Sequence, residues 1–99
     1  MYNKMVLPGG LHNAKPITDE VANIVSSVKA AIEAKTGESY SSFNPIEFAT
    51  QTVAGVNYFV KVRTQNGCIH VRIYKDLSQT VSVHSVQTGK QITDPIEYF

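Results

Sequence analysis

Only one pair of reactive side chains in this sequence stands at a spacing that could place both together. Cys68 and His70 are two residues apart in an alternating stretch, so both should project from the same face of a strand. A thiolate and an imidazole can bind zinc, but a zinc site needs three or four ligands, and no partner pair has ligand spacing. We therefore expect no metal and no cofactor. Cys68 would be an ordinary strand residue, and His70 a solvated or cross-strand paired side chain.

The other histidines lack a catalytic context. His12 and His84 have no neighbouring Ser, Asp or Cys in a nucleophile motif, and the sequence contains no Gly-x-Ser-x-Gly elbow. An enzyme needs several polar groups that converge on one pocket, and this inventory is thin. We expect that the protein is not an enzyme.

A short uncharged segment is more informative. Residues 51–55, Gln-Thr-Val-Ala-Gly, separate two strand-like runs and should expose Val53 and Ala54 at a hairpin tip. Exposed apolar tips are typical of contact surfaces. The alternative is that Val53 folds back onto the sheet.

A second uncharged segment, residues 77–79, joins the next two strands. Alternate connections of an antiparallel meander lie at the same end of the sheet, so residues 51–55 and 77–79 should be neighbours. If Gly9 and Gly10 of the N-terminal arm also emerge there, three uncharged segments would form one apolar edge suited to entering a groove.

One helix should cover the sheet that carries this edge. Thr18 offers an N-cap, Asp19 and Glu20 suit the first turn, and Gly37 is a stop signal, which predicts about 17 residues. The apolar face has helical spacing and consists of Val21, Ile24, Val25, Val28 and Ile32.

The rest of the chain alternates as strands do. Runs near residues 46–51, 56–63, 69–74 and 81–85 predict strands, with Val56, Tyr58, Val60 and Val62 on one face. Asn66-Gly67 predicts a type I′ turn. We expect an α+β fold in which an antiparallel sheet of four to five strands wraps around one α-helix, with one face packed and the other wet. Residues 1–99 would form a single domain whose residues 1–10 are an extended, partly mobile arm.

Charge and length exclude several function classes. The chain has 99 residues and a formal charge of +1, and its nine Lys and Arg residues are scattered. Nucleic-acid binders concentrate cations on one face, so we expect no nucleic-acid partner. No stretch approaches the roughly 18 apolar residues of a membrane span, and no signal-peptide core is present. We expect no membrane association and a cytoplasmic location.

The motifs together resemble the stefins, the type 1 branch of the cystatin superfamily, over essentially the whole chain. Residues 51–55 fit the family's Gln-x-Val-x-Gly hairpin, and residues 56–62 resemble the strand that follows it. Upstream, residues 7–11, Leu-Pro-Gly-Gly-Leu, resemble the Pro-Gly-Gly arm, and the chain ends in Glu97, Tyr98 and Phe99, as stefins tend to.

The resemblance implies reversible, tight-binding inhibition of papain-like cysteine proteases such as cathepsins, by a wedge that blocks the active-site cleft. It implies that Gly9 is the trunk glycine, so that Val6, Leu7 and Pro8 lie in the non-primed substrate subsites. The first hairpin over the catalytic cysteine would be formed by Gln51, Thr52, Val53, Ala54 and Gly55. Leu77 and Ser78 match the second hairpin, where Ser78 replaces a Pro common in vertebrate stefins and the connection is shorter.

Two other functions stay open from the residues. A small-ligand-binding α+β protein would line a pocket between helix and sheet with Tyr40, Tyr58, His70 or Asp76. Such a pocket needs an open, cone-shaped space between the helix and the sheet, whereas the apolar face of the helix should fill that space. The other alternative is a cystatin-fold interaction module that lacks inhibition.

The expected oligomeric state is a monomer. The hairpin at residues 51–55 joins two strands that can open into one long strand, which would give a domain-swapped dimer. If Cys68 is exposed, oxidation would offer a second route to a dimer.

Overall fold

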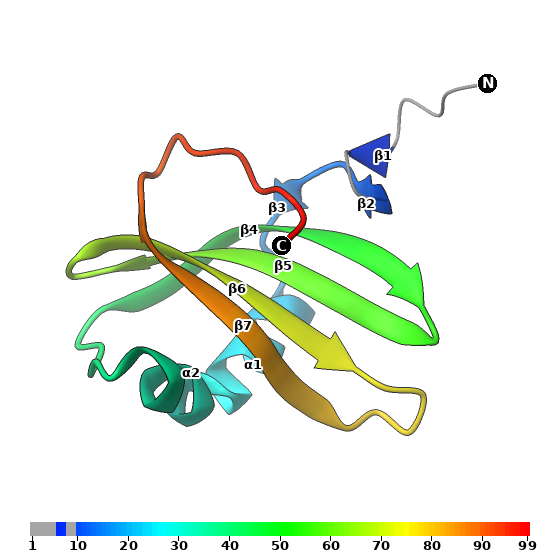
Figure 1. Ribbon diagram of the computed structural model, residues 1–99, viewed down its shortest axis with the longest axis horizontal. Helices are drawn as coiled ribbons and strands as arrows, with labels where there is room; N and C mark the ends of the chain where they lie inside the picture. The colour runs from blue at the N-terminus through cyan, green and yellow to red at the C-terminus, as the bar shows by residue number, and fades with distance from the viewer. Residues whose placement is uncertain (1–5, 8–9) are drawn as a thin grey trace.

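The computed structural model describes residues 6–7 and 10–99. A five-stranded antiparallel sheet is formed, in spatial order, by β3 (Lys15–Pro16), β4 (Phe43–Val53), β5 (Gly55–Thr64), β6 (Gly67–Lys75) and β7 (Val81–Lys90). Two helices cover one face of it (Figure 1). The strands β1 (Val6–Leu7) and β2 (Leu11–His12) form a separate antiparallel pair. The expected α+β fold is confirmed.

The helical segment is interrupted at Val28, so the expectation of one uninterrupted helix is wrong. It consists of α1 (Asp19–Ser27) and α2 (Lys29–Thr36). The Ser27 hydroxyl donates to the carbonyl of Ile24 at 2.6 Å, and that carbonyl is the normal acceptor for the amide of Val28. The Val28 amide bonds instead to Val25 O at 3.2 Å, which tightens the turn.

The predicted helix ends are confirmed. The Thr18 hydroxyl accepts a hydrogen bond from the Val21 amide at 3.3 Å, and Asp19 and Glu20 lie in the first turn. Gly37 ends the segment in a left-handed conformation with φ of +73°.

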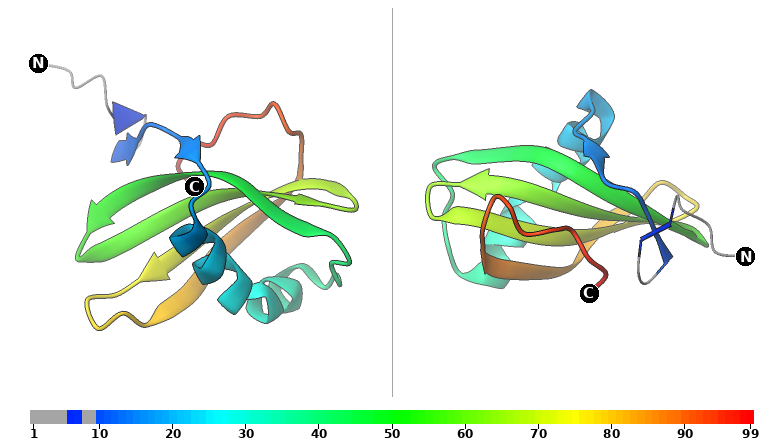
Figure 2. Two further views of the ribbon diagram at one scale, coloured as in Figure 1. Left: turned by 180° about the vertical axis from the view of Figure 1, so that it is seen from behind. Right: turned by 90° about the horizontal axis from the view of Figure 1, so that it is seen from above.

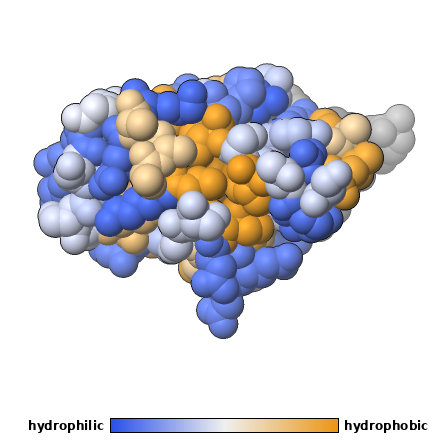
Figure 3. All heavy atoms as spheres, turned by 90° about the horizontal axis from the view of Figure 1, so that it is seen from below, coloured by the Kyte–Doolittle hydropathy of each residue, from blue (hydrophilic) through white to orange (hydrophobic). Residues whose placement is uncertain are grey.

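The main core lies between the helices and the inner face of the sheet (Figure 2). Tyr58, Val60 and Val62 point into it, as their alternation predicted. The helices contribute the buried residues Val21, Val25, Val28 and Ile32. Partly buried hydrophobic residues border this core, and the face seen from below shows hydrophobic side chains gathered across its middle (Figure 3).

The outer face of the sheet carries a second hydrophobic cluster, so the expectation of a wet face is wrong at its centre. Leu11 from β2 and Ile96 from the C-terminal segment are buried there against Ala49 and Phe59, with Phe99 packed alongside. Figure 1 shows the C-terminal segment passing over the strands on the side away from the helices.

Two cationic side chains hold this covering segment to the sheet. Lys61 Nζ donates to Ile92 O at 2.7 Å and pairs with Glu47 at 2.8 Å. Arg72 Nη1 donates to Phe99 O at 2.7 Å, and its guanidinium lies over the rings of Phe59 and Tyr98. The Ile92 carbonyl and the Glu47 carboxylate are the partners that the buried Lys61 requires.

The turn between β5 and β6 also differs from expectation. Thr64 pairs with Gly67, so Gln65 and Asn66 form the turn. A type I′ turn needs positive φ at both central residues, whereas Gly67 alone has positive φ, +114°, among these positions. The Asn66 amide instead bonds to Thr64 Oγ1 at 3.1 Å.

Candidate functional site

The first hairpin is almost entirely strand. Val53 is the last residue of β4 and pairs with Gly55, the first residue of β5, so Ala54 alone lies outside the ladder. Thr52 and Ala54 are exposed, and the Val53 side chain is 45% exposed. Val53 is therefore exposed as expected, and the alternative in which it folds back onto the sheet is wrong.

Gly55 is required by the neighbouring strand as well as by the turn. Its φ is +109°, a value that side chains disfavour. A Cβ atom here would overlap the carbonyl oxygen of Lys75 and would lie 3.1 Å from the Cα of Asp76. The tip of the first hairpin thus lies directly against the end of β6.

The second hairpin, residues 76–80, is organised by one carboxylate. Asp76 Oδ1 accepts hydrogen bonds from the amides of Ser78 and Thr80, both at 2.9 Å. The chain reverses through Gln79, which has φ of +71°. Leu77 is left 77% exposed. Sequence reasoning missed this role of Asp76, although an Asp at the start of a short connection is a common signal for such turns.

The arm meets the first hairpin at Gln51. A Cβ atom on Gly10 would lie 3.4 Å from Gln51 Nε2, and Gln51 Oε1 accepts a hydrogen bond from Asn57 Nδ2 at 2.9 Å. Gln51 therefore links the arm to β5, while the tip residues reach solvent.

Within the arm, Val6 pairs with His12 and Leu7 with Leu11. Pro8 and Gly9, and the other positions of the expected mobile arm up to residue 5, lie outside the described residues.

The structure brings the predicted segments to one end of the sheet. The first and second hairpins are adjacent because β5 and β6 pair directly, and the described part of the arm lies beside the first hairpin in both figures (Figures 1 and 2). Residues 51–55 and 77–79 carry no charge, and they present Val53 and Leu77 to solvent. We call this surface the hairpin edge. It can bury apolar area in a groove without stranding an ion.

Cys68 and His70 do share a face of β6, but both are buried on the outer side of the sheet, at 4% and 1% exposure. The expectation of a solvated His70 is wrong, because the C-terminal residues cover it. Within residues 6–7 and 10–99, no three His, Cys, Asp or Glu side chains are grouped as a metal site would require.

The environment of His70 favours the neutral imidazole. Burial lowers its pKa from 6.5 to about 4, helped by the positive charges of Lys90 and Lys61 and opposed by Asp94 and Glu47. Its Nε2 atom has no hydrogen-bond partner among the residues that the structure describes. This histidine belongs to the packing of the outer face.

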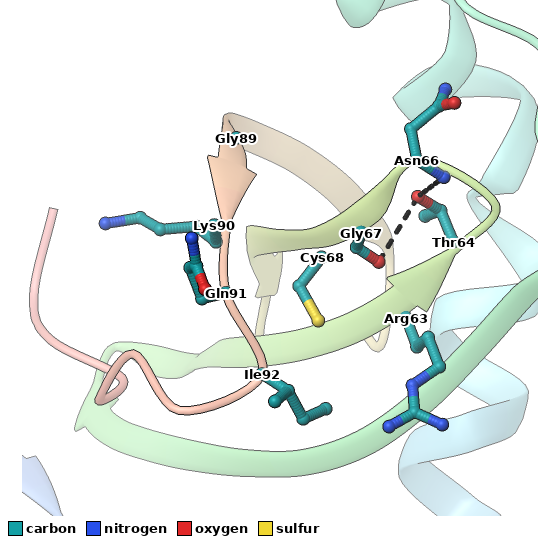
Figure 4. Close-up of a pocket in the computed structure, with 9 residues that line it drawn as sticks. All are labelled: Arg63, Thr64, Asn66, Gly67, Cys68, Gly89, Lys90, Gln91 and Ile92. Carbon is teal, nitrogen blue, oxygen red and sulfur yellow. Dashed lines mark hydrogen bonds between the residues drawn. The ribbon is translucent and has the colours of Figure 1, made fainter.

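A pocket of about 570 Å³ lies near the opposite end of the sheet from the hairpin edge (Figure 4). The thiol of Cys68 points into it, while Arg63 and Lys90 extend outward on different sides. No acid–base pair is formed among the residues that line it, which are Arg63, Thr64, Asn66, Gly67, Cys68, Gly89, Lys90, Gln91 and Ile92.

The structure does not bring together the residues expected for a small-ligand site. Tyr40 and Tyr58 are buried in the inner core, His70 is on the opposite face, and Asp76 is in the second hairpin. Apolar helix residues fill the space between helix and sheet. A ligand-binding function is not favoured.

None of the helices in the described part of the chain is long and apolar enough to span a membrane.

Comparison with known proteins assigns the family. A family model described as a cystatin domain matches residues 9–93. The chain belongs to the cystatin family. It is 43% identical to Cystatin-A of Mus musculus over 97 residues, covering 95% of this chain and all of that protein. It is 46% identical to Cystatin-A2 of Dictyostelium discoideum over 95 residues, covering 96% and 100% of the two chains.

The stefin resemblance is confirmed as well. Stefin-2 of Mus musculus is 35% identical over 96 residues, which cover 94% of this chain and 93% of that protein. These relatives are named as cystatins and a stefin rather than as enzymes. With the fold and the family in agreement, this cystatin is an inhibitor of cysteine proteases, as the motifs implied.

Proposed function

We propose that this cystatin is a reversible, tight-binding inhibitor of papain-like cysteine proteases such as cathepsins, and that the hairpin edge is its binding surface. The observation that supports this most is that apolar side chains are exposed on a main chain that is itself held in place. Val53 and Leu77 are exposed at 45% and 77%, while strand pairing and the Asp76 hydrogen bonds hold the backbones that carry them.

The proposed roles follow the position of each residue. Thr52, Val53 and Ala54 would enter the cleft above the catalytic cysteine, and Leu77 and Ser78 would contact the adjacent wall. Gln51 and Gly55 would shape the first hairpin from within, because Gln51 bonds to Asn57 and Gly55 faces β6.

The arm would occupy the substrate subsites, with Val6, Leu7 and Pro8 bound and Gly9 as the trunk glycine. Val6 and Leu7 pair with β2 in the free chain, so this mode of binding requires that pairing to open.

Inhibition of this kind needs no catalytic group on the inhibitor. Association costs several kcal/mol of translational and side-chain freedom, and a preorganised edge reduces the part due to ordering. The inhibitor escapes cleavage if none of its carbonyl carbons comes within about 3 to 3.5 Å of the protease thiolate in attack geometry. We therefore propose that the protein is not itself an enzyme.

We further propose that the protein acts as a monomer in the cytoplasm. The continuous β4–β5 hairpin, with only Ala54 outside the ladder, provides a hinge through which two chains could exchange the helices together with β4 and form a domain-swapped dimer. Such a dimer would lose the first hairpin and with it inhibition.

Titration of papain with the purified protein tests this function. We expect stoichiometric loss of peptidase activity that is regained on dilution and is nearly independent of salt, because the described part of the hairpin edge is uncharged at residues 51–55 and 77–79. Deletion of residues 1–9 should raise the inhibition constant without changing the thermal midpoint. Full papain activity at a large excess of the intact protein would refute the proposal.

A further inference from the structure

Two side chains, one near the end of β6 and one just after it, make hydrogen bonds to the main chain of the two hairpins. The Tyr74 hydroxyl donates a hydrogen bond to the main-chain oxygen of Ala54, the one residue at the tip of the first hairpin that lies outside the ladder. The Tyr74 ring also supports the tip from below, since its Cε1 atom would lie 3.1 Å from a Cβ atom on Gly55. Tyr74 is itself paired with Asn57 in the sheet, so it holds the tip from a fixed position.

Asp76 holds the second hairpin two residues further on. Its carboxylate accepts the amides of Ser78 and Thr80, and its own amide donates to Thr80 O at 2.9 Å. Leu77, between these contacts, is 77% exposed. The second hairpin is therefore shaped by Asp76 and not by packing of its own apolar side chain.

Lys75, between Tyr74 and Asp76, points away from both hairpins. Its ammonium lies 4.0 Å from Glu20 of α1 and 5.8 Å from the centre of the Tyr58 ring on the inner face. Strand alternation thus places Tyr74 on the face opposite to Lys75, toward the first hairpin.

We propose that Tyr74 and Asp76 are positioning residues for protease inhibition, which together hold the two hairpins as one preformed surface. The proposal rests on the proposed function and adds which residues give the edge its rigidity. Tyr74 acts through the carbonyl of Ala54, and Asp76 acts through the amides of the second hairpin.

The effect on binding follows from the population of the competent shape. Without the Tyr74 hydroxyl, the carbonyl of Ala54 loses this hydrogen bond, and the tip can adopt several conformations. Only the fraction of molecules with the correct tip binds, so the apparent dissociation constant rises by the inverse of that fraction. Loss of one hydrogen bond of ordinary strength corresponds to about a fivefold change in such an equilibrium.

The experiment compares four variants of the full chain. Tyr74→Phe keeps the ring and removes the hydroxyl, and Asp76→Ala removes the acceptor of the second hairpin. Asp76→Asn is the conservative variant, because its side-chain oxygen can still accept both amides. Tyr40→Phe is the matched control, since it also removes a hydroxyl hydrogen bond, to Thr36 Oγ1 at 3.1 Å, at the opposite end of the fold.

Three quantities are measured for each variant: the association and dissociation rates with papain, the thermal midpoint, and amide hydrogen exchange of residues 53–56 and 77–80 without protease. We expect Tyr74→Phe and Asp76→Ala each to raise the inhibition constant about fivefold. Each should speed exchange in its own hairpin. Asp76→Asn should restore inhibition, and Tyr40→Phe should inhibit as the parent does.

Unchanged inhibition constants for Tyr74→Phe and Asp76→Ala, with a parent protein that inhibits papain, would overturn this inference alone. An equal loss in Asp76→Asn and Asp76→Ala would overturn the role of Asp76, because the acceptor oxygen would then not matter. A parent protein that fails to inhibit papain would instead refute the proposed function itself.

Discussion

At the scale of single residues, Gly55 and Gly89 illustrate two different reasons why a position favours glycine: backbone conformation and lack of space for a side chain. Both have positive φ, +109° and +68°, but a Cβ atom would overlap Lys75 O at Gly55 and would meet open space at Gly89. We expect Gly89→Ala to cost about 1 kcal/mol through backbone strain alone. Gly55→Ala should cost about 3 kcal/mol, because overlap is added to strain.

Urea unfolding of both variants measures this difference, and papain titration measures its functional side. Gly55→Ala should also raise the inhibition constant, whereas Gly89→Ala should not. Equal destabilisation by the two substitutions would show that the approach of β6 to the first hairpin is looser than described.

His70 makes the stability of the protein depend on pH. Its pKa is about 4 in the folded chain because burial opposes the charged form, and about 6.5 when unfolded. Below pH 6.5 the unfolded chain therefore binds a proton that the folded chain does not. The contribution of the neutral His70 to the free energy of unfolding is fully present above this pH and is lost as the pH falls to about 4. The loss should be about 3 kcal/mol.

The measurement is urea unfolding between pH 7 and 4 for the parent protein, His70→Gln and His84→Gln. The parent should lose about 3 kcal/mol more than His70→Gln over this range. The exposed His84 provides a matched His-to-Gln substitution outside the packing of the outer face. Parallel pH profiles for the parent and His70→Gln would contradict the prediction.

At the scale of elements, local sequence signals were sufficient to predict the two ends of the helical segment but not its interruption at Val28. Thr18 and Gly37 act on amides and carbonyls within one turn, so sequence alone could place them. The break at Val28 depends on which of two donors the Ile24 carbonyl accepts, and Ser27 is common in uninterrupted helices too. The predicted type of the turn at residues 64–67 was wrong for a similar reason, because the Thr64 hydroxyl accepts the Asn66 amide.

The N-cap gives a prediction at this scale. Thr18→Ala should reduce the free energy of unfolding by about 1 kcal/mol, because the Val21 amide loses its acceptor. Thr18→Ser retains the hydroxyl and should remain within a few tenths of a kcal/mol of the parent. Denaturant unfolding monitored by circular dichroism measures both, and equal losses would contradict a capping role.

At the scale of the whole molecule, the covered outer face could not be anticipated. The inner core follows from alternation within strands, whereas Phe59 and His70 are buried by residues far away in sequence, such as Leu11 and those near Ile96. The hairpin edge was predictable as a set of segments, because meander topology places alternate connections together. Of the two side chains that hold it, Asp76 carries a local turn signal at the start of a short connection. Tyr74 could not be predicted, because its partner is a main-chain oxygen 20 residues away in another hairpin.

The C-terminal segment should be as important for stability as part of the inner core. Ile96 is 4% exposed in the outer cluster, so Ile96→Ala should cost about 2 to 4 kcal/mol. Ile92 is 41% exposed, and Ile92→Ala leaves the carbonyl that Lys61 binds in place, so it should cost under about 1 kcal/mol. Urea unfolding compares the two, and similar small losses would show that the segment adds little.

Three side chains of the outer face, Lys61, Arg72 and Tyr74, bind main-chain oxygens, at Ile92, Phe99 and Ala54. A carbonyl is the same whichever amino acid carries it. During divergence, the three acceptor positions can therefore change identity without loss of these bonds, and the donors need no compensating substitution. Correlated changes between positions would not reveal these contacts, so the ties that close the outer face and the first hairpin would leave almost no trace in an alignment.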